Sequence, residues 1–322
     1  MPHLPALPAP DFHLIPGEDL SGGLRRICLE QFEASLDSLS SGPDLNLAIH
    51  ELRKSNKRVR ALLRMVRPVI GDKVYRAEND ALVQASRLVA PVRNGKVLLD
   101  AVTRLRGRYS HLLAPGVFGG IEDRLHNRHE RMMNRILDDP EVLQQVTAIV
   151  YRARSRYAAW PTDPSDPRYG ARMIPNSFRS IGAGVSRTYD RGRKAMEVAY
   201  RTRAPQQFHD WRKQVKYLRH QMEVLDPLWP EVIGGLAASL EHLGDVLGDD
   251  HDQSELIALV AALPELAPDP DERNLLVALS HQRRRELEGA ARVMGGRIYA
   301  EGAKQFTDRL KAYWSAWSYG RD

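Results

Sequence analysis

Two stretches of the sequence repeat the same arrangement of histidine, acidic and basic residues. Both follow the order His-acid-x-Arg-Lys-x-x-Lys-x-x-Arg, the first from His50 to Arg60 and the second from His209 to Arg219. Arginine and lysine side chains carry only hydrogen-bond donors and are normally charged, so a row of them favours an oxyanion such as phosphate or carboxylate. The two stretches therefore predict an anion-binding site.

On an α-helix, the basic residues of each stretch share one face. At about 100° per residue they fall within a stripe of roughly 80° that begins at the histidine. The first stripe consists of His50, Arg53, Lys57, Arg60 and Arg64, opposite the apolar Val59, Leu62, Leu63 and Val66. The second consists of His209, Arg212, Lys216 and Arg219, opposite Trp211, Val215, Leu218, Met222 and Leu225. We expect each helix to bury its apolar face and to present its basic face to a ligand.

The positive charge of the chain is concentrated in the first of these helices. The whole sequence has 47 basic and 41 acidic residues, a formal net charge of +6. Between His50 and Arg67 there are seven basic residues against Glu51 alone, an excess equal to that of the entire chain. Like charges one turn apart destabilise a helix by a few tenths of a kcal/mol per pair. A bound anion is the simplest compensation, and a solvated basic face is the alternative.

The two stretches belong to an internal repeat. They align at a fixed offset of 159 residues, and a downstream segment, Val89 to Asn94, aligns with Leu247 to Asp252 at an offset of 158. Two segments in the same order at nearly the same offset indicate a duplication. We expect two helical bundles that face each other about a pseudo-twofold axis.

The spacing of apolar residues predicts an all-α fold. Apolar residues recur every three to four positions along most of the chain, which predicts about a dozen helices. Breaks are expected where Gly, Pro, Asn and Asp gather, at 41–43, 68–72, 93–95, 115–116, 138–140, 205, 227–230, 248–250 and 264–270. The expected organisation is a flexible tail over 1–17, a first bundle over 18–159, a linker over 160–176 and a second bundle over 177–322.

Several classes of protein are disfavoured. A single cysteine, Cys28, cannot form an internal disulfide or a multi-cysteine zinc site. No apolar run reaches about 18 residues, and the start lacks the features of a signal peptide, so a cytoplasmic protein without a membrane span is expected. No glycine-rich phosphate loop is present. Few aromatic residues lie among the basic ones, which favours a bare phosphate polymer over single-stranded nucleic acid.

The doubled motif resembles the CHAD family, the conserved histidine α-helical domain, over roughly residues 18–318. This resemblance implies two pseudo-symmetric four-helix bundles around a basic central cleft or pore. It also implies binding of inorganic polyphosphate and association with polyphosphate granules. The positions that match the family motif are His50, Arg53, Lys54, Lys57, Arg60, His209, Arg212, Lys213, Lys216 and Arg219. The helix around Thr188 to Met196 adds the weaker matches Arg191, Arg193 and Lys194.

The chain also departs from the family pattern. The first copy has Arg93-Asn94 where an Arg-Asp pair is usual, and the second has His251-Asp252. The counterpart of Arg64 in the second copy is the acidic Glu223, so the second stripe is expected to be weaker at its far end.

Two other functions remain open on sequence grounds. In a metal-dependent phosphohydrolase, His209-Asp210 and the segment Asp249 to Asp252 would supply ligands, although that segment is expected to form a turn and an N-cap between helices. A nucleic-acid-binding protein would use the same basic stripes. The favoured hypothesis is a non-catalytic protein without cofactor or metal. Two further basic groups could complete the site or face solvent: Arg124, Arg128, Arg131 and Arg135, and Arg283 with Arg284.

Overall fold

The structure, a computed structural model, describes residues 11–41, 44–160 and 174–319. Across these ranges it contains ten α-helices, two short 3-10 helices and no strand, which confirms the all-α prediction. The helices before residue 161 are α1 (Leu20–Ser41), α2 (Leu45–Leu88), α3 (Ala90–Arg108), α4 (Gly119–Asp138) and α5 (Pro140–Ala158). Those after residue 173 are α6 (Arg179–Thr202), α7 (Pro205–Leu225), α8 (Pro230–Ala262), α9 (Pro270–Ile298) and α10 (Ala303–Tyr319), with η1 (Asp226–Leu228) and η2 (Pro264–Leu266) between them.

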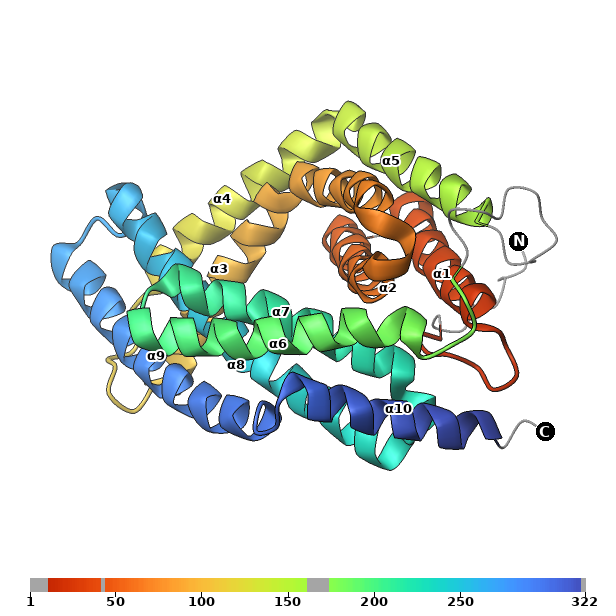
Figure 1. Ribbon diagram of the computed structural model, residues 1–322. Helices are drawn as coiled ribbons and strands as arrows, with labels where there is room; N and C mark the ends of the chain where they lie inside the picture. Colours follow the sequence, from red (N-terminus) through yellow and green to blue (C-terminus); the bar gives the residue numbers. More distant parts are fainter. Residues whose placement is uncertain (1–10, 42–43, 161–173, 320–322) are drawn as a thin grey trace.

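Helix α2 lies between the two sets of helices. In Figure 1, α4 and α5 run along one side of the molecule, α6 to α10 lie along the other, and α2 is seen nearly end-on between them. Helix α2 packs against α1 and α5 on one side and against α6 and α7 on the other. None of the helices in the described part of the chain is long and apolar enough to cross a membrane.

The two basic stretches form helices as predicted, near the starts of α2 and α7. The carboxylate of Asp44 caps α2 by accepting hydrogen bonds from the backbone of Asn46 and Leu47, and Pro205 occupies the first turn of α7. The apolar faces are buried. Every apolar residue predicted to lie opposite the stripes is at most 2% exposed: Val59, Leu62, Leu63, Val66, Trp211, Val215, Leu218, Met222 and Leu225.

Helix α2 folds back on itself at one of the expected breaks. Gly71 has φ 78° and ψ 161°, a conformation that only glycine adopts readily, three residues after Pro68. The two arms of α2 are joined by hydrogen bonds, including Arg53 to the carbonyl of Ser86 at 2.8 Å and Asn56 to the hydroxyl of Ser86 at 3.0 Å. The stretch that carries the first basic motif therefore packs against its own continuation.

Two of the expected breaks are wrong. Helix α8 runs unbroken through residues 248–250, and residues 93–95 lie inside α3. The segment Asp249 to Asp252 is therefore helical and not a turn with an N-cap. The glycines at these places allow side chains of neighbouring helices to pack closely against the backbone. A Cβ atom on Gly248 would lie 3.0 Å from Nη2 of Arg212, and one on Gly95 would lie 3.1 Å from Nδ1 of His129.

The apolar core does not divide at the expected linker. The larger cluster of buried residues extends from Phe12 to Trp314, and the smaller one joins α3 and α4 to α8 and α9. Helices α6 and α2 approach each other closely, since a Cβ atom on Gly184 would lie 1.9 Å from the carbonyl oxygen of Met65. The two halves thus share one core. Residues 161–173 of the expected linker lie outside the described residues, and the boundaries of the two bundles stay a prediction.

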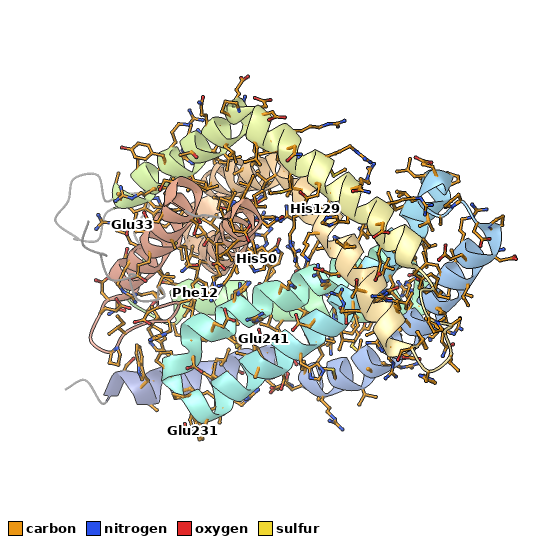
Figure 2. The ribbon with its side chains drawn as sticks, turned by 180° about the vertical axis from the view of Figure 1, so that it is seen from behind. Phe12, Glu33, His50, His129, Glu231 and Glu241 are labelled. Carbon is orange, nitrogen blue, oxygen red and sulfur yellow. The ribbon has the colours of Figure 1, made fainter. Side chains whose placement is uncertain are left out.

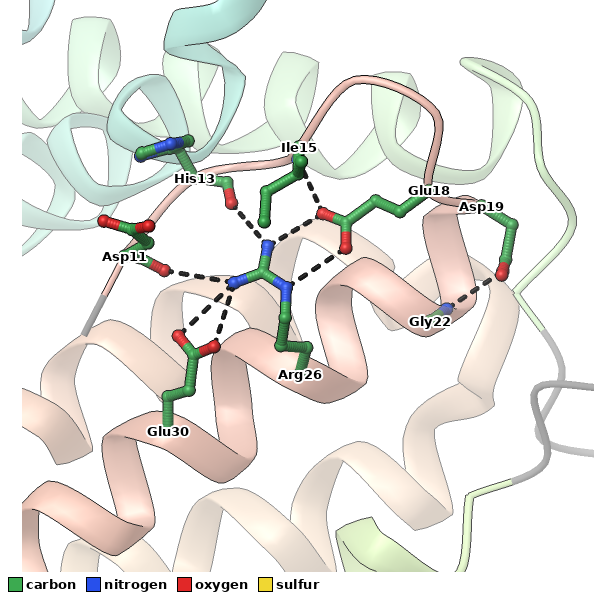
Figure 3. Close-up of polar contacts among 8 residues, drawn as sticks. All are labelled: Asp11, His13, Ile15, Glu18, Asp19, Gly22, Arg26 and Glu30. Atoms are coloured by element: carbon green, nitrogen blue, oxygen red, sulfur yellow. Dashed lines mark hydrogen bonds and ion pairs between the residues drawn. The ribbon is translucent and has the colours of Figure 1, made fainter.

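Residues 11–17, the described part of the expected tail, are anchored to α1 and α7. Phe12 and Leu14 are 6% and 2% exposed, and the backbone N–H of Leu14 donates to the carbonyl of Val224. Figure 3 shows how Arg26 of α1 holds this segment. It donates to the carbonyl of His13 at 2.8 Å and pairs with the carboxylates of Glu18 and Glu30. Residues 1–10 lie outside the described residues.

Candidate anion-binding site

A cavity of about 520 Å³ lies between α2, α3, α6, α7 and α8. Nine basic side chains and two acidic ones, Asp252 and Glu255, line it. The basic residues are Arg53, Lys57, Arg60, Arg64, Arg93, Arg191, Arg212, Lys213 and Lys216. Both basic stretches thus contribute to one positively lined space.

The central lysines of the two stretches meet in this cavity. Lys57 and Lys216 are equivalent residues of the repeat, and both are lining residues. Burial and the neighbouring charge of Lys216 lower the pKa of Lys57 to about 6. Burial and the charge of Arg212 lower the pKa of Lys216 to about 8. Positive charge is therefore costly in the ligand-free cavity, and an anion would favour the charged form of both lysines.

Most of the lining cations have no carboxylate partner within the described residues. There, only Lys213 forms an ion pair, with Asp210 at 2.9 Å. Arg53 donates to a backbone carbonyl, that of Ser86. Burial lowers the pKa of Arg53, Arg64 and Arg212, because their surroundings disfavour the charged form.

Neutral groups hold two of the arginines in place. The side-chain oxygen of Asn79 accepts hydrogen bonds from Arg60 at 3.1 Å and from Arg64 at 3.2 Å. Arg60 also donates to the hydroxyl of Tyr217 at 3.1 Å. The Arg64 guanidinium lies 3.8 Å from the ring centroid of Tyr217 and 5.5 Å from that of Tyr75. These contacts orient the guanidinium groups without cancelling their charge, which is how a preorganised anion site is built.

Two histidines stand beside each other in the same cavity. The rings of His209 and His251 have centroids 3.9 Å apart. Burial and nearby cations lower the pKa of His209 to about 4, and burial and His209 lower that of His251 to about 3. Both rings are therefore neutral near pH 7. Nδ1 of His209 is buried without a hydrogen-bond partner in the described structure.

Five of the residues expected at the site do not line the cavity. His50, labelled in Figure 2, lies on α2 and is exposed, although burial of part of its ring and the charge of Arg93 lower its pKa. Arg193 of α6 lies outside the lining. The other three form ion pairs elsewhere: Lys54 with Glu51 at 3.2 Å, Lys194 with Asp190 at 2.6 Å, and Arg219 with both Glu223 and Glu241 at 2.7 Å.

The charge of Glu223 accounts for the placement of Arg219. Glu223 stands at the position equivalent to Arg64, so the repeat replaces a cation by an anion one turn beyond Arg219. The carboxylate pairs with that arginine on the same helix, and Arg219 does not line the cavity. The weaker far end that the sequence predicts for the second stripe has this structural basis.

The lining residues that are missing from the expected set include four polar or charged residues of the downstream repeat: Arg93, Asn94, His251 and Asp252. The downstream part of the repeat could have identified them. It aligns Arg93-Asn94 with His251-Asp252, and all four residues line the cavity. The remaining basic groups do not line it. Arg284 instead pairs with Asp250 at 2.9 Å and with Glu288 at 3.2 Å.

Acidic residues of α8 pair with arginines. Asp250 binds Arg284, and Arg104 lies 3.4 Å from Asp249 and 3.1 Å from Asp252. Within residues 11–41, 44–160 and 174–319, no group of three or more His, Cys, Asp or Glu side chains is placed to hold a metal ion.

A family model described as the CHAD domain matches residues 25–261, about three quarters of the sequence. The chain belongs to the CHAD family. Among solved structures, this CHAD chain is similar to PptA from Streptomyces chartreusis, with a TM-score of 0.61 and 19% identity over 88% of this chain and 100% of that one. At this identity the likeness shows a shared fold. No curated protein matches the sequence.

Proposed function

We propose that this CHAD protein binds inorganic polyphosphate, without cleaving it, in the cavity between α2 and α7. The observation that carries the proposal is the position of Lys57 and Lys216. These equivalent residues of the repeat line the same space, and each has its charge disfavoured there in the absence of a ligand. Membership of the CHAD family supports a phosphate polymer as the anion that restores this charge.

A polymer fits the arrangement better than a single phosphate does. The lining cations of α2 extend from Arg53 to Arg64, about 16 Å at 1.5 Å per residue. Binding would release counterions from a densely charged chain, in the way that nucleic acids release them, so affinity should depend steeply on salt. Each charge-assisted hydrogen bond contributes about 1.5–3 kcal/mol before the cost of desolvation.

We further propose that the two sets of helices, α1 to α5 and α6 to α10, are related by a pseudo-twofold axis that passes near the cavity. The arms of α2 would correspond to α7 and the first part of α8, and α3 would correspond to the second part of α8. The alignment of Val89–Asn94 with Leu247–Asp252 supports this correspondence. Each wall would then supply one arginine and one lysine at equivalent places.

Nucleic acid is the less favoured ligand because the aromatic rings at the site are already in contact with arginine. Tyr217 and Tyr75 both line the cavity, but Arg64 lies over both rings. Base-stacking platforms need open ring faces. Competition between polyphosphate and single- or double-stranded nucleic acid at one salt concentration separates the two ligands.

The double variant Lys57→Glu/Lys216→Glu tests the binding site. We expect it to lose at least about 100-fold in affinity for long-chain polyphosphate, since two attractive contacts become repulsive. The control, Lys73→Glu/Lys311→Glu, makes the same change of charge at two exposed lysines outside the cavity and should bind nearly as the parent does. Equal affinities of the two double variants would contradict the assignment of the cavity.

Two further measurements test the rest of the proposal. Incubation of the protein with polyphosphate and Mg²⁺ or Mn²⁺ should release no orthophosphate, and release that depends on the protein would favour a phosphohydrolase. In cells, we propose that the protein is cytoplasmic and gathers at polyphosphate granules. A fluorescent fusion should co-localise with the granules, whereas its Lys57→Glu/Lys216→Glu variant should be dispersed.

A further inference from the structure

The two walls of the cavity, one formed by α2 and α3 and the other by α7 and α8, differ in negative charge at equivalent positions of the repeat. Asn94 of α3 and Asp252 of α8 correspond in the repeat, and both line the cavity. The first wall therefore has a neutral amide where the second has a carboxylate. The other acidic lining residue, Glu255, also belongs to α8 and lies one turn further on. Negative charge at this site is thus confined to one wall.

Asp252 is positioned from outside the cavity. Arg104 of α3, which does not line the cavity, donates to Oδ2 of Asp252 at 3.1 Å. The Asp252 side chain is 16% exposed, whereas that of Arg104 is 47% exposed. Arg104 also lies 3.4 Å from Asp249, which is not a lining residue. Helix α8 therefore presents two carboxylates to the same arginine. Of these two, only Asp252 lines the cavity.

Within the cavity, Asp252 acts on the cations of the second wall. Its negative charge favours the charged forms of Arg212 and Lys216. Burial raises the pKa of Asp252 to about 6, even though Arg212, Arg104 and Arg93 act in the opposite direction. The carboxyl group is hence mostly ionised near pH 7, and a second anion beside it would favour its protonation.

We propose that Asp252 is a resident counter-anion, which competes with the ligand for Arg212 and Lys216 and so limits the affinity of the second wall for phosphate. The inference rests on the proposed function and extends it to ligand selection. A short phosphate of low charge meets the repulsion of Asp252 with few compensating contacts. A long polyphosphate also engages the first wall, where Asn94 offers no repulsion, and can therefore bind in spite of Asp252.

Three single variants test this role by their affinities for tripolyphosphate and for long-chain polyphosphate near neutral pH. Asp252→Asn should bind tripolyphosphate about tenfold more tightly, because one like charge within the site is removed. Asn94→Asp, which places a carboxylate at the equivalent position of the first wall, should weaken binding of both ligands by about tenfold. The matched control is Asp249→Asn. It loses the same charge beside the same arginine, but outside the cavity. Because Asp249 acts on Arg212 more weakly than Asp252 does, the affinity of this variant should stay within about twofold of the parent value.

A second readout requires no ligand. In the ligand-free protein, NMR titration of carbon-13-labelled lysine should show a lower pKa of Lys216 in Asp252→Asn than in the parent, since a stabilising negative charge is lost. Asp249→Asn should leave the Lys216 titration in place. Arg212, Asp245 and Arg219 also act on Lys216, and all three variants retain them.

The outcomes separate the two proposals. A parent protein that binds no polyphosphate disproves the proposed function, and the competition at Asp252 with it, whatever the Lys216 titration shows. If the parent binds, an unchanged Lys216 titration in Asp252→Asn, or an equal gain of affinity in Asp252→Asn and Asp249→Asn, overturns the role of Asp252 alone and leaves the proposed function standing.

Discussion

The guanidinium group of Arg64 lies 3.8 Å from the ring centroid of Tyr217, so an arginine of the first half rests on a tyrosine of the second. The hydroxyl of the same tyrosine accepts a hydrogen bond from Arg60. Tyr217 is 8% exposed and thereby orients two cations of the cavity without adding negative charge. The contributions of its ring and of its hydroxyl can be separated by mutation.

Replacement of Tyr217 by leucine should weaken polyphosphate binding and lower stability together. The ring contact and the hydroxyl acceptor are both lost, and we expect the free energy of unfolding to fall by about 2 kcal/mol. Affinity should fall about fivefold, since Arg60 and Arg64 lose their fixed orientation. Tyr217→Phe keeps the ring and should retain most of the affinity. Chemical denaturation and titration calorimetry measure the two effects, and a Phe variant as weak as the Leu variant would contradict the role of the ring.

The pH dependence of binding should follow the two central lysines. The pKa is about 6 for Lys57 and about 8 for Lys216 in the ligand-free protein, and a polyanion raises both values. Binding therefore takes up protons, and affinity should fall as the pH rises above about 6 and fall further above about 8. Calorimetry in buffers of different ionisation enthalpy measures the proton uptake.

The variant Lys57→Arg/Lys216→Arg separates the lysines from the other groups of the cavity. Arginine stays charged throughout this range, so the variant should show a flatter pH profile, with the remaining slope due to Asp252. The histidines contribute only at lower pH, because the pKa of His209 is about 4 and that of His251 is about 3. A profile as steep as that of the parent would contradict the assignment to the lysines.

Salt dependence should distinguish cations that line the cavity from cations that only match the motif. For a single-stranded polyanion, log K falls by about 0.7 per neutralised charge for each unit of log salt concentration. Arg53→Gln should therefore reduce the slope by roughly one contact. Lys54→Gln and Arg219→Gln should leave it nearly unchanged, because both residues pair with carboxylates outside the cavity. Equal changes in all three variants would show that the motif, and not the cavity, determines binding.

The contact between α6 and α2 should be intolerant of any side chain at residue 184. A Cβ atom there would lie 1.9 Å from the carbonyl oxygen of Met65, so Gly184→Ala must push the two helices apart. We expect a loss of about 3 kcal/mol of stability, in the range of overpacked cores. Gly107→Ala in α3 is the matched control, since nothing lies near its Cβ position, and it should be neutral or slightly stabilising. Thermal unfolding of the two variants decides the comparison.

The all-helical fold and the two basic helices could be predicted because they depend on local patterns. The 3–4 spacing of apolar residues determines which faces of α2 and α7 are buried, and Val59 and Trp211 are buried as that spacing predicts. Glycine was less informative. Gly71 reverses the chain, whereas Gly248 lies within a continuous helix, where its missing side chain makes room for Arg212. Only tertiary contacts separate these two uses of glycine.

The residues that line the cavity could be predicted in part. Helical phase places Lys57 and Lys216 on the basic stripes, but phase alone does not reveal which cations have acidic partners. Arg219 shares its stripe with Lys216, yet Glu223 and Glu241 hold it elsewhere. His251 and Asp252 lie on a third helix and reach the cavity through the packing of α8 on α7. The downstream repeat aligns them with Arg93 and Asn94, but only the fold shows that this segment lies beside the basic helices.

Because of the bend at Gly71, the arginines and the lysines of this cavity depend to different degrees on the docking of the two halves of the chain. It returns the chain so that Asn79 contacts Arg60 and Arg64, and one helical hairpin of the first half therefore supplies part of the scaffold for these arginines. The lysine pair has no such local origin, since Lys57 and Lys216 come together only when sequence-distant halves dock. The ligand capture proposed for the lysines would consequently be a property of the completed molecule, because a nascent chain that ends before α7 lacks Lys216 and also Tyr217, which orients Arg60 and Arg64.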